Sequence, residues 1–259
     1  MQSVIDAHIH LDMYTEPEQQ RILQELNASN VVALICVSNH LKSAGKLLDL
    51  SKKDTRVKPA IGYHPEQELP TEEEFLGLWK WMDQKSKHFV AIGEVGLPYY
   101  MRKDNPEVNL TAYVELLEKF IMKAAQLDKP IVLHAVYEDA PIVCDLLEKH
   151  QVSKAHFHWF KGDEQTVERM IKNGYYISIT PDCLYEAEIQ KLIQSYPLEQ
   201  MMIETDGPWP FEREFQGRLT HPHMLHRIVE KIATLKKMNE GQVYQKLLMN
   251  TKQFYNLTD

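Results

Sequence analysis

Val4-Ile5-Asp6-Ala7-His8-Ile9-His10-Leu11-Asp12 is the stretch of sequence that decides the fold. Its first part, Val4 to Ile9, is an apolar run with the length of a short strand. His8 and His10 stand at the end of this run, and side chains two residues apart in a strand point to the same face. Because histidine is the commonest metal ligand, the pair predicts half of a metal site. The alternative is one histidine that caps the strand and one that is solvated in a loop.

More short β-like runs follow at fairly even intervals: Val31–Val37, Val57–Ile61, Phe89–Ile92, Ile131–Leu133, Ala155–Phe157, Tyr175–Ile179 and Met201–Ile203. Between them lie stretches with helical periodicity, among them Leu110–Leu127, Ala140–His150 and Glu164–Asn173. Strands that alternate with helices favour parallel pairing. About eight such units in a chain of this length are typical of a TIM (β/α)8 barrel. An open doubly wound sheet usually carries a glycine-rich loop after its first strand, where this chain has histidines, so we predict the barrel.

The organisation of the chain predicts a single (β/α)8-barrel domain over residues 1–259. No low-complexity linker, repeat motif or shift in composition divides it. After Met224 the apolar spacing predicts one helix, and a second helix is expected from Gln242 to Phe254 on the outside of the barrel.

Composition and charge exclude several classes of protein. The chain is 44% hydrophobic and 25% charged, which is typical of a soluble globular protein, and no apolar run approaches the ~20 residues of a membrane span. The N-terminal residues lack the pattern of a signal peptide, and an odd number of widely spaced cysteines suits free thiols, so a cytoplasmic location is expected. A net charge of −8 argues against a dedicated nucleic-acid-binding module, although bound cations can still meet phosphates.

Imidazoles and carboxylates stand at the C-terminal ends of most predicted strands. In a TIM barrel these ends form one mouth, which holds the active site. The candidate metal ligands at these ends are His8, His10, Glu94, His134, His158 and Asp206. Alternation alone cannot choose between His156 and His158. Because Trp159 and the residues after it place His158 at the strand end, we assign His158 as the ligand and His156 to a deeper layer.

This set of four imidazoles and two carboxylates predicts two divalent metal ions. A catalytic zinc site commonly keeps three protein ligands and a water, whereas six ligands on one ion would leave no open position. Two ions ~3.5–4 Å apart can activate a water and hold the leaving oxygen. We expect Glu94, which is flanked by Gly93 and Gly96, to bridge them. Imidazole with carboxylate suits Zn, Mn, Ni, Fe or Co, and Mg less well.

Taken in order, these motifs resemble the TatD family of metal-dependent hydrolases, which belongs to the amidohydrolase-like barrels. The matching segments span almost the whole chain: Asp6–Asp12, Gly62–Pro65, Gly93–Leu97, His134, His158–Gly162 and Glu204–Asp206. The resemblance implies a barrel with a divalent-metal centre at the six ligands above, and hydrolysis, with DNA as the substrate usually named. It also implies that His64 binds the substrate, at a phosphate.

Two positions depart from the family pattern. Pro98 stands where the family usually has Asp, and Val136 stands where it usually has Arg, two residues after the fifth-strand histidine. A missing Arg removes a bidentate phosphate donor, and a missing Asp removes a polar group beside the centre. We therefore expect an intact metal centre with an altered phosphate pocket.

The leading hypothesis is a two-metal phosphodiesterase or deoxyribonuclease that uses a metal-activated hydroxide and acts on DNA or a small phosphodiester. Asp206 would bind one ion and take the proton of the water as a general base, and the alternative role for Asp206 is an N-cap of the helix that follows. A second hypothesis is that the same centre hydrolyses a carboxylic ester, lactone or amide. A third is a barrel that binds a metal or ligand without turnover. The pattern carries no information on the oligomeric state, and no association with a membrane is expected.

Other candidates are weaker. A second metal site is one reading of His221, His223 and His226, and a solvated helix start is the other. Asp12 could orient His10 as an outer carboxylate or merely lead into the next helix. Four residues could line the substrate entrance and supply stacking and charge, or could be ordinary loop surface: Tyr99, Tyr100, Arg102 and Lys103. Trp159 and Trp209 could form walls of the pocket or serve packing only.

Overall fold

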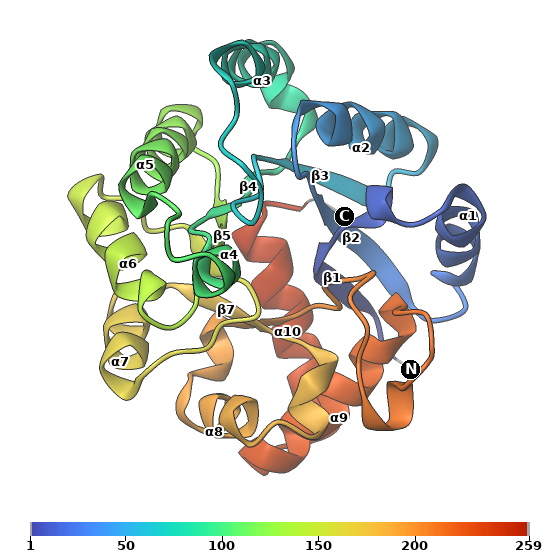
Figure 1. The fold of residues 1–259 in the computed structure, drawn as a ribbon. Helices are drawn as coiled ribbons and strands as arrows, with labels where there is room; N and C mark the ends of the chain where they lie inside the picture. The colour runs from blue at the N-terminus through green and yellow to red at the C-terminus, as the bar shows by residue number, and fades with distance from the viewer. Residues whose placement is uncertain (1, 258–259) are drawn as a thin grey trace.

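Eight parallel strands form one sheet in the order of the chain, and the sheet curls into a barrel (Figure 1). The computed structural model describes residues 2–257. The strands are β1 (Val4–Ile9), β2 (Val31–Val37), β3 (Val57–Ile61), β4 (Ala91–Gly96), β5 (Ile131–His134), β6 (Ala155–Phe157), β7 (Tyr176–Ile179) and β8 (Met201–Ile203). The predicted TIM (β/α)8 barrel is confirmed.

The ring closes between β1 and β8, which contact each other. Beyond the end of β8, the Asp206 amide donates a 3.0 Å hydrogen bond to the His8 carbonyl. The His10 amide donates a 2.8 Å bond to the Gly207 carbonyl. The ends of the first and last strands are thereby joined at the mouth of the barrel.

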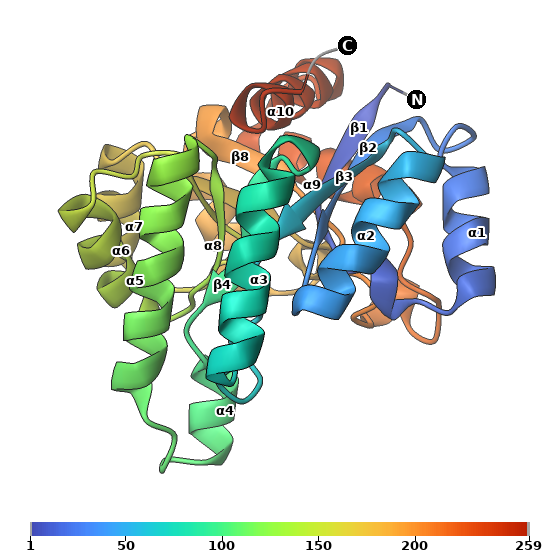
Figure 2. The ribbon, with the colours of Figure 1, turned by 90° about the horizontal axis from the view of Figure 1, so that it is seen from above.

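Helices surround the barrel and cover its ends (Figures 1 and 2). The outer ring contains α1 (Glu16–Glu25), α2 (Leu41–Lys53), α3 (Glu72–Lys85), α5 (Leu110–Leu127), α6 (Asp139–Lys149), α7 (Glu164–Lys172), α8 (Ala187–Ser195) and α9 (Leu225–Lys236). The short helix α4 (Tyr99–Asp104) projects at the end where the strands finish. The last helix, α10 (Glu240–Phe254), crosses the opposite end and contacts β1 and β8.

The strands are buried on both faces, as is usual for parallel sheets. One apolar cluster lies inside the barrel, where Ile5 and Ala7 of β1 pack with Phe254 and Tyr255 at the end of the chain. A second, larger cluster lies between the strands and the outer helices and contains Val4 and other residues that face outward. Strand side chains in the first cluster therefore point into the barrel, and those in the second point outward to the helices.

Two further properties of the chain concern its cysteines and the apolarity of its helices. The predicted free thiols are confirmed, because Cys36, Cys144 and Cys183 are buried and unbridged. Within residues 2–257, no helix combines the length and the apolarity that crossing a membrane requires.

The boundary of β4 differs from the sequence prediction. A strand was expected at Phe89–Ile92, with Glu94 in the loop after it, whereas the strand runs from Ala91 to Gly96. Gly96 continues the pairing with β5, opposite His134. Gly93 and Gly96 lie within the strand, where a glycine permits close approach to a neighbouring backbone.

We expect Gly96→Ala to destabilise the protein by about 3 kcal/mol or more, because overpacking against an immovable backbone is costly. A Cβ atom on Gly96 would overlap the carbonyl oxygen of His134 and lie 2.7 Å from its carbonyl carbon. Gly45→Ala is the matched control, because a Cβ atom there meets nothing within 4 Å on helix α2. The control should gain about 0.5–1 kcal/mol. Urea unfolding measures both, and equal midpoints for the two variants would contradict the expectation.

Candidate metal centre

A β-bulge in β1 turns His8 and His10 into the barrel. From Asp6 to Ile9 the strand advances by three residues while its partner β2 advances by only two, from Leu34 to Cys36. Ala7 packs in the cluster inside the barrel and Ile9 packs in the outer cluster, so the alternation of side chains is reset between them. Without the extra residue, simple alternation would point both histidines toward the helices.

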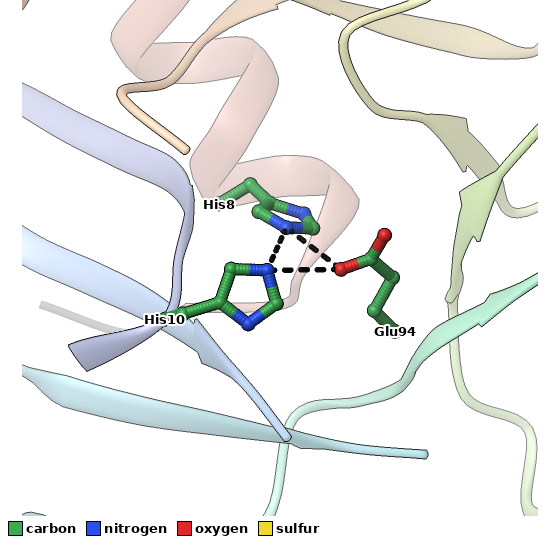
Figure 3. A group of neighbouring side chains, drawn as sticks. All are labelled: His8, His10 and Glu94. Carbon is green, nitrogen blue, oxygen red and sulfur yellow. Dashed lines mark hydrogen bonds and ion pairs between the residues drawn. The ribbon is translucent and has the colours of Figure 1, made fainter. Parts of the chain in front are cut away.

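A second bulge, in β4, turns Glu94 into the barrel. The strand advances from Ile92 to Val95 while β5 advances only from Ile131 to Leu133. Ile92 and Val95 both pack in the outer cluster, although they are three positions apart in the sequence. Glu94 therefore points inward, opposite the two histidines of β1, as Figure 3 shows.

Glu94 lies at the centre of the site and faces a different group of imidazoles with each of its oxygens. Its Oε2 atom lies 3.2 Å from His8 Nε2 and 3.1 Å from His10 Nε2. Its Oε1 atom lies 2.7 Å from His158 Nε2 and 3.0 Å from His134 Nδ1. The carboxylate is fully buried. The structure thus brings four of the predicted ligands around the fifth.

Asp206, the sixth predicted ligand, joins the His8 side of this arrangement. Its Oδ1 atom lies 3.2 Å from His8 Nε2 and 3.5 Å from His10 Nε2. Asp206 has a positive φ of 47° and is followed by turns rather than by a helix. The alternative role of Asp206 as a helix N-cap is therefore wrong.

The donor atoms fit a bound cation. Glu94 Oε2 and Asp206 Oδ1 are buried and have no hydrogen-bond donor within residues 2–257. A buried carboxylate oxygen without a donor is costly unless a cation neutralises it. Single ligand atoms of His8, His10 and Glu94 lie within 4.8 Å of one another, and so do those of His64, Glu94 and His134. These groups could hold metal ions on both sides of Glu94.

The structure separates the two histidines of the sixth strand. His156 Nδ1 is 2.7 Å from the Tyr255 hydroxyl and Nε2 is 2.5 Å from the Ser178 hydroxyl, so both of its nitrogens are occupied. Burial lowers the pKa of His156 well below its usual value, which keeps the ring neutral in this layer. The ring of His158 instead stacks on that of His8, with centroids 3.9 Å apart, and its Nε2 atom faces Glu94.

Two buried carboxylates that the sequence analysis left without a role support the ligands. Glu204 lies 3.7 Å from His158 Nδ1 and accepts a 2.7 Å hydrogen bond from the Trp159 amide. Asp6 accepts hydrogen bonds from the amide and hydroxyl of Thr205, at 2.9 and 2.6 Å, and ties β1 to the end of β8. Glu204 contacts His158 of the neighbouring segment rather than Asp206, so its spacing in the sequence did not reveal this contact.

Glu66 was also missed, although it contacts a predicted ligand. Its Oε1 atom is 3.1 Å from His134 Nε2. The same carboxylate accepts hydrogen bonds from the amides of Tyr100 and Met101, at 2.8 and 2.7 Å, where helix α4 begins. Glu66 therefore fixes the orientation of the His134 ring and holds α4 at the mouth.

We expect Glu66→Gln to weaken metal binding about 10- to 100-fold, as is usual when the outer partner of a ligating histidine is changed. Glutamine keeps the size of the side chain but removes the charge that makes His134 a better ligand. Competition with a fluorescent chelator measures the affinity. Glu68→Gln, on an exposed residue of the same loop, is the control. Equal affinity in the two variants would show that Glu66 does not act on His134.

His64 stands at the edge of the centre with its Nε2 atom 3.4 Å from Glu94 Oε1. Its Nδ1 atom accepts a 3.1 Å hydrogen bond from the Glu66 amide. Burial lowers the pKa of His64 to about 4, so the ring is neutral at neutral pH. A neutral imidazole whose Nδ1 accepts a bond carries its proton on Nε2, and this N–H is available as a donor at the centre.

Metal affinity should rise with pH between about 6.5 and about 9. Burial on its own would lower the pKa of His8, and neighbouring His158 lowers it further, but the carboxylates of Glu94 and Asp206 raise it to about 9 in the metal-free protein. An imidazole must lose its proton to bind a metal, so binding at neutral pH releases protons. Calorimetry in buffers of different ionisation enthalpy counts them. Proton uptake, or an affinity that falls over this range, would contradict the expectation.

The centre opens into a cavity of about 560 Å3 at the mouth of the barrel. Val136, at the position of the family's usual Arg, lines this cavity, and so do His64 and the aromatic residues Tyr100, Trp159 and Trp209. Pro98 lies outside its lining and precedes helix α4. No Lys or Arg side chain is among the described residues that line it.

The three histidines after the last strand do not converge. His226 is engaged by the Tyr244 hydroxyl and the Ser29 carbonyl, each at 2.7 Å, so both of its nitrogens are occupied. His221 and His223 face each other through their Nδ1 atoms at 2.8 Å. The reading of a three-histidine metal site is therefore not supported.

Comparison with known proteins places these features in a family. Residues 5–256 match the family model described as TatD related DNase. An uncharacterized metal-dependent hydrolase of Haemophilus influenzae is 39% identical over 98% of this chain and 100% of its own length. The human protein named deoxyribonuclease TATDN3 is 28% identical over 97% of this chain and 94% of its own. The crystal structure of YjjV, a TatD homolog from Escherichia coli, has the same fold, with a TM-score of 0.89 at 24% identity over 98% of both chains.

Proposed function

Since this chain belongs to the TatD family of metal-dependent hydrolases, we propose that it hydrolyses phosphodiester bonds in DNA at a two-metal centre. The observation that carries the proposal is the arrangement around Glu94, whose two oxygens face two separate groups of imidazoles. The name of the human relative supports DNA as the substrate.

We assign the metal ligands from this arrangement. His8, His10, Glu94 and Asp206 would hold one ion, and Glu94, His134 and His158 would hold the other. The donors suit Zn, Mn, Ni, Fe or Co, and Mg less well. When bound, such a pair of ions supplies Lewis acidity and lowers the pKa of a water to about 7.

Asp206 is the general base in this proposal. Burial on its own would raise the pKa of Asp206, but the hydrogen bond from His8 and the charges of the neighbouring imidazoles lower it. The side chain is therefore ionised, and an ionised carboxylate can take the proton of the attacking water. The water oxygen bonds to phosphorus, the P–O bond to the leaving group breaks, and the leaving oxygen takes a proton from solvent.

His64 binds the scissile phosphate. Its neutral ring offers the Nε2 proton at the centre, and no Lys or Arg side chain among the described lining residues competes for the same oxygen. This single donor orients the phosphate without neutralising it.

Cytoplasmic location is also proposed, because three buried free thiols suit a reducing compartment.

Cleavage of labelled single-stranded DNA tests the proposal. The protein is stripped with a chelator and reconstituted with Mn²⁺, Zn²⁺ or Co²⁺, and cleavage should be lost and then restored. If the reconstituted protein holds about two ions and cuts no DNA, the phosphodiesterase proposal fails. The second candidate function, hydrolysis of an ester, lactone or amide by the same centre, then takes its place. Val136 and a described cavity lining without Lys or Arg favour that candidate.

A further inference from the structure

Two exposed aromatic side chains stand across the mouth of the barrel from each other. Tyr100 belongs to α4, which follows β4, and Trp209 lies in the segment after β8. In an eight-stranded ring these two strands are opposite each other, and Figure 1 shows α4 and the segment after β8 on different sides of the barrel axis. Tyr100 is 44% exposed and Trp209 is 56% exposed, and both line the cavity over the centre.

Both aromatic residues are held in place by the backbone next to the metal centre. Glu66 accepts the amide hydrogen of Tyr100, and the Tyr100 ring lies 6.1 Å from the ring of His134. The Trp209 amide donates a 3.1 Å hydrogen bond to the Asp206 carbonyl, and the Trp209 carbonyl accepts a hydrogen bond from the Thr220 hydroxyl. Large aromatic surfaces held rigid and left in solvent are typical of binding sites.

The same mouth offers little positive charge to a polyanion. The guanidinium of Arg102, on α4, is 2.5 Å from a buried carboxylate of Asp139. Lys161 is 4.0 Å from Asp182 and 5.8 Å above the Trp159 ring. The whole chain carries a net charge of −8. A strand of DNA is therefore not held here by cations along its backbone, as charge-driven binding would require.

We propose that Tyr100 and Trp209 bind the base of one unpaired nucleotide beside the scissile phosphate, so that the enzyme selects its substrate by stacking. This inference rests on the proposed function and names how the same site recognises its substrate. The cavity of about 560 Å3 suits a ligand of roughly the size of one nucleotide. Stacking on an aromatic ring tolerates any base, because every base has a π-face, and it requires that the base leave its duplex.

Binding of two matched ligands to the Mn²⁺-loaded protein tests the stacking directly. Thymidine 5′-monophosphate and 2-deoxyribose 5-phosphate carry the same phosphate and differ only in the base. By calorimetry, we expect the wild type to bind the nucleotide at least about tenfold more tightly. Tyr100→Leu and Trp209→Leu should each reduce this preference severalfold and leave the affinity for the sugar phosphate unchanged. Tyr100→Phe and Trp209→Phe, which keep an aromatic ring, should retain most of it.

Hydrolysis of two DNA strands gives the second readout. A strand of thymidylates and a strand of the same length made of abasic residues have equal charge, and KM should be at least severalfold lower for the first. KM for the thymidylate strand should change less than about threefold between about 50 and about 200 mM KCl. A strand held by about four cationic contacts would weaken roughly fiftyfold over that range.

The possible outcomes distinguish a failure of the proposed nuclease function from a failure of the stacking proposal. If neither strand is cut, the proposed function fails. If both are cut with equal KM, or if the preference for the base survives in both leucine variants, the stacking proposal is overturned and the nuclease stands. A steep dependence of KM on salt would likewise overturn it, because cations that the cavity does not show would then hold the strand.

Discussion

Glu94→Gln should lower kcat for DNA cleavage by roughly a thousandfold or more and reduce the number of bound metal ions. Each carboxylate oxygen of Glu94 faces two imidazoles, at distances between 2.7 and 3.2 Å. A glutamine keeps one acceptor oxygen but places an NH2 group at the other position. This group cannot ligate a cation on its side of the site. The bridge between the two halves of the centre is then lost.

Metal analysis by mass spectrometry and cleavage of labelled single-stranded DNA measure these two effects. Glu186→Gln, on an exposed residue in the segment after β7, is the matched control and should behave as the wild type does. Circular dichroism checks that the buried substitution leaves the fold intact. If cleavage survives in Glu94→Gln, the chemistry lies elsewhere or the preparation contains another nuclease.

Asp206→Asn should retain the fold and most of the metal but lower kcat about 10²- to 10⁴-fold, the range over which general bases contribute. Asparagine matches aspartate in shape and can still offer an oxygen to an ion. It cannot take a proton from water at neutral pH. KM for DNA should change little, because Asp206 acts on the water rather than on the strand.

The pH profile separates a base from a simple ligand. Because the pKa of Asp206 is lowered by His8, the wild type should keep its base ionised to below the usual range of a carboxyl group. Wild-type rates in Asp206→Asn would end the assignment of a base. A variant that loses both activity and an ion would show that Asp206 acts through metal binding alone, and the base would then have to be sought among other groups.

Much of this architecture could be predicted from the sequence, because the relevant patterns are local. The apolar runs that alternate with amphipathic helices specify a parallel barrel. Five of the predicted strands, including Val4–Ile9 and Val31–Val37, have the observed boundaries. A parallel barrel gathers the ends of all its strands at one mouth, so His8, Glu94 and His134 could be expected to meet although up to 126 residues separate them.

Only the tertiary structure decided which way the ligands point and what holds them. Because both faces of these strands are buried, an apolar run does not show which side is the inside of the barrel. Alternation put His8 and His10 on one face, but the bulges of β1 and β4 turned that face inward. The contact of Glu66 with His134 and the placement of Tyr100 opposite Trp209 likewise join distant segments. Local sequence determined the strands and the donor types, and long-range packing determined the geometry of the site, because register and side-chain direction depend on neighbours that the local pattern does not contain.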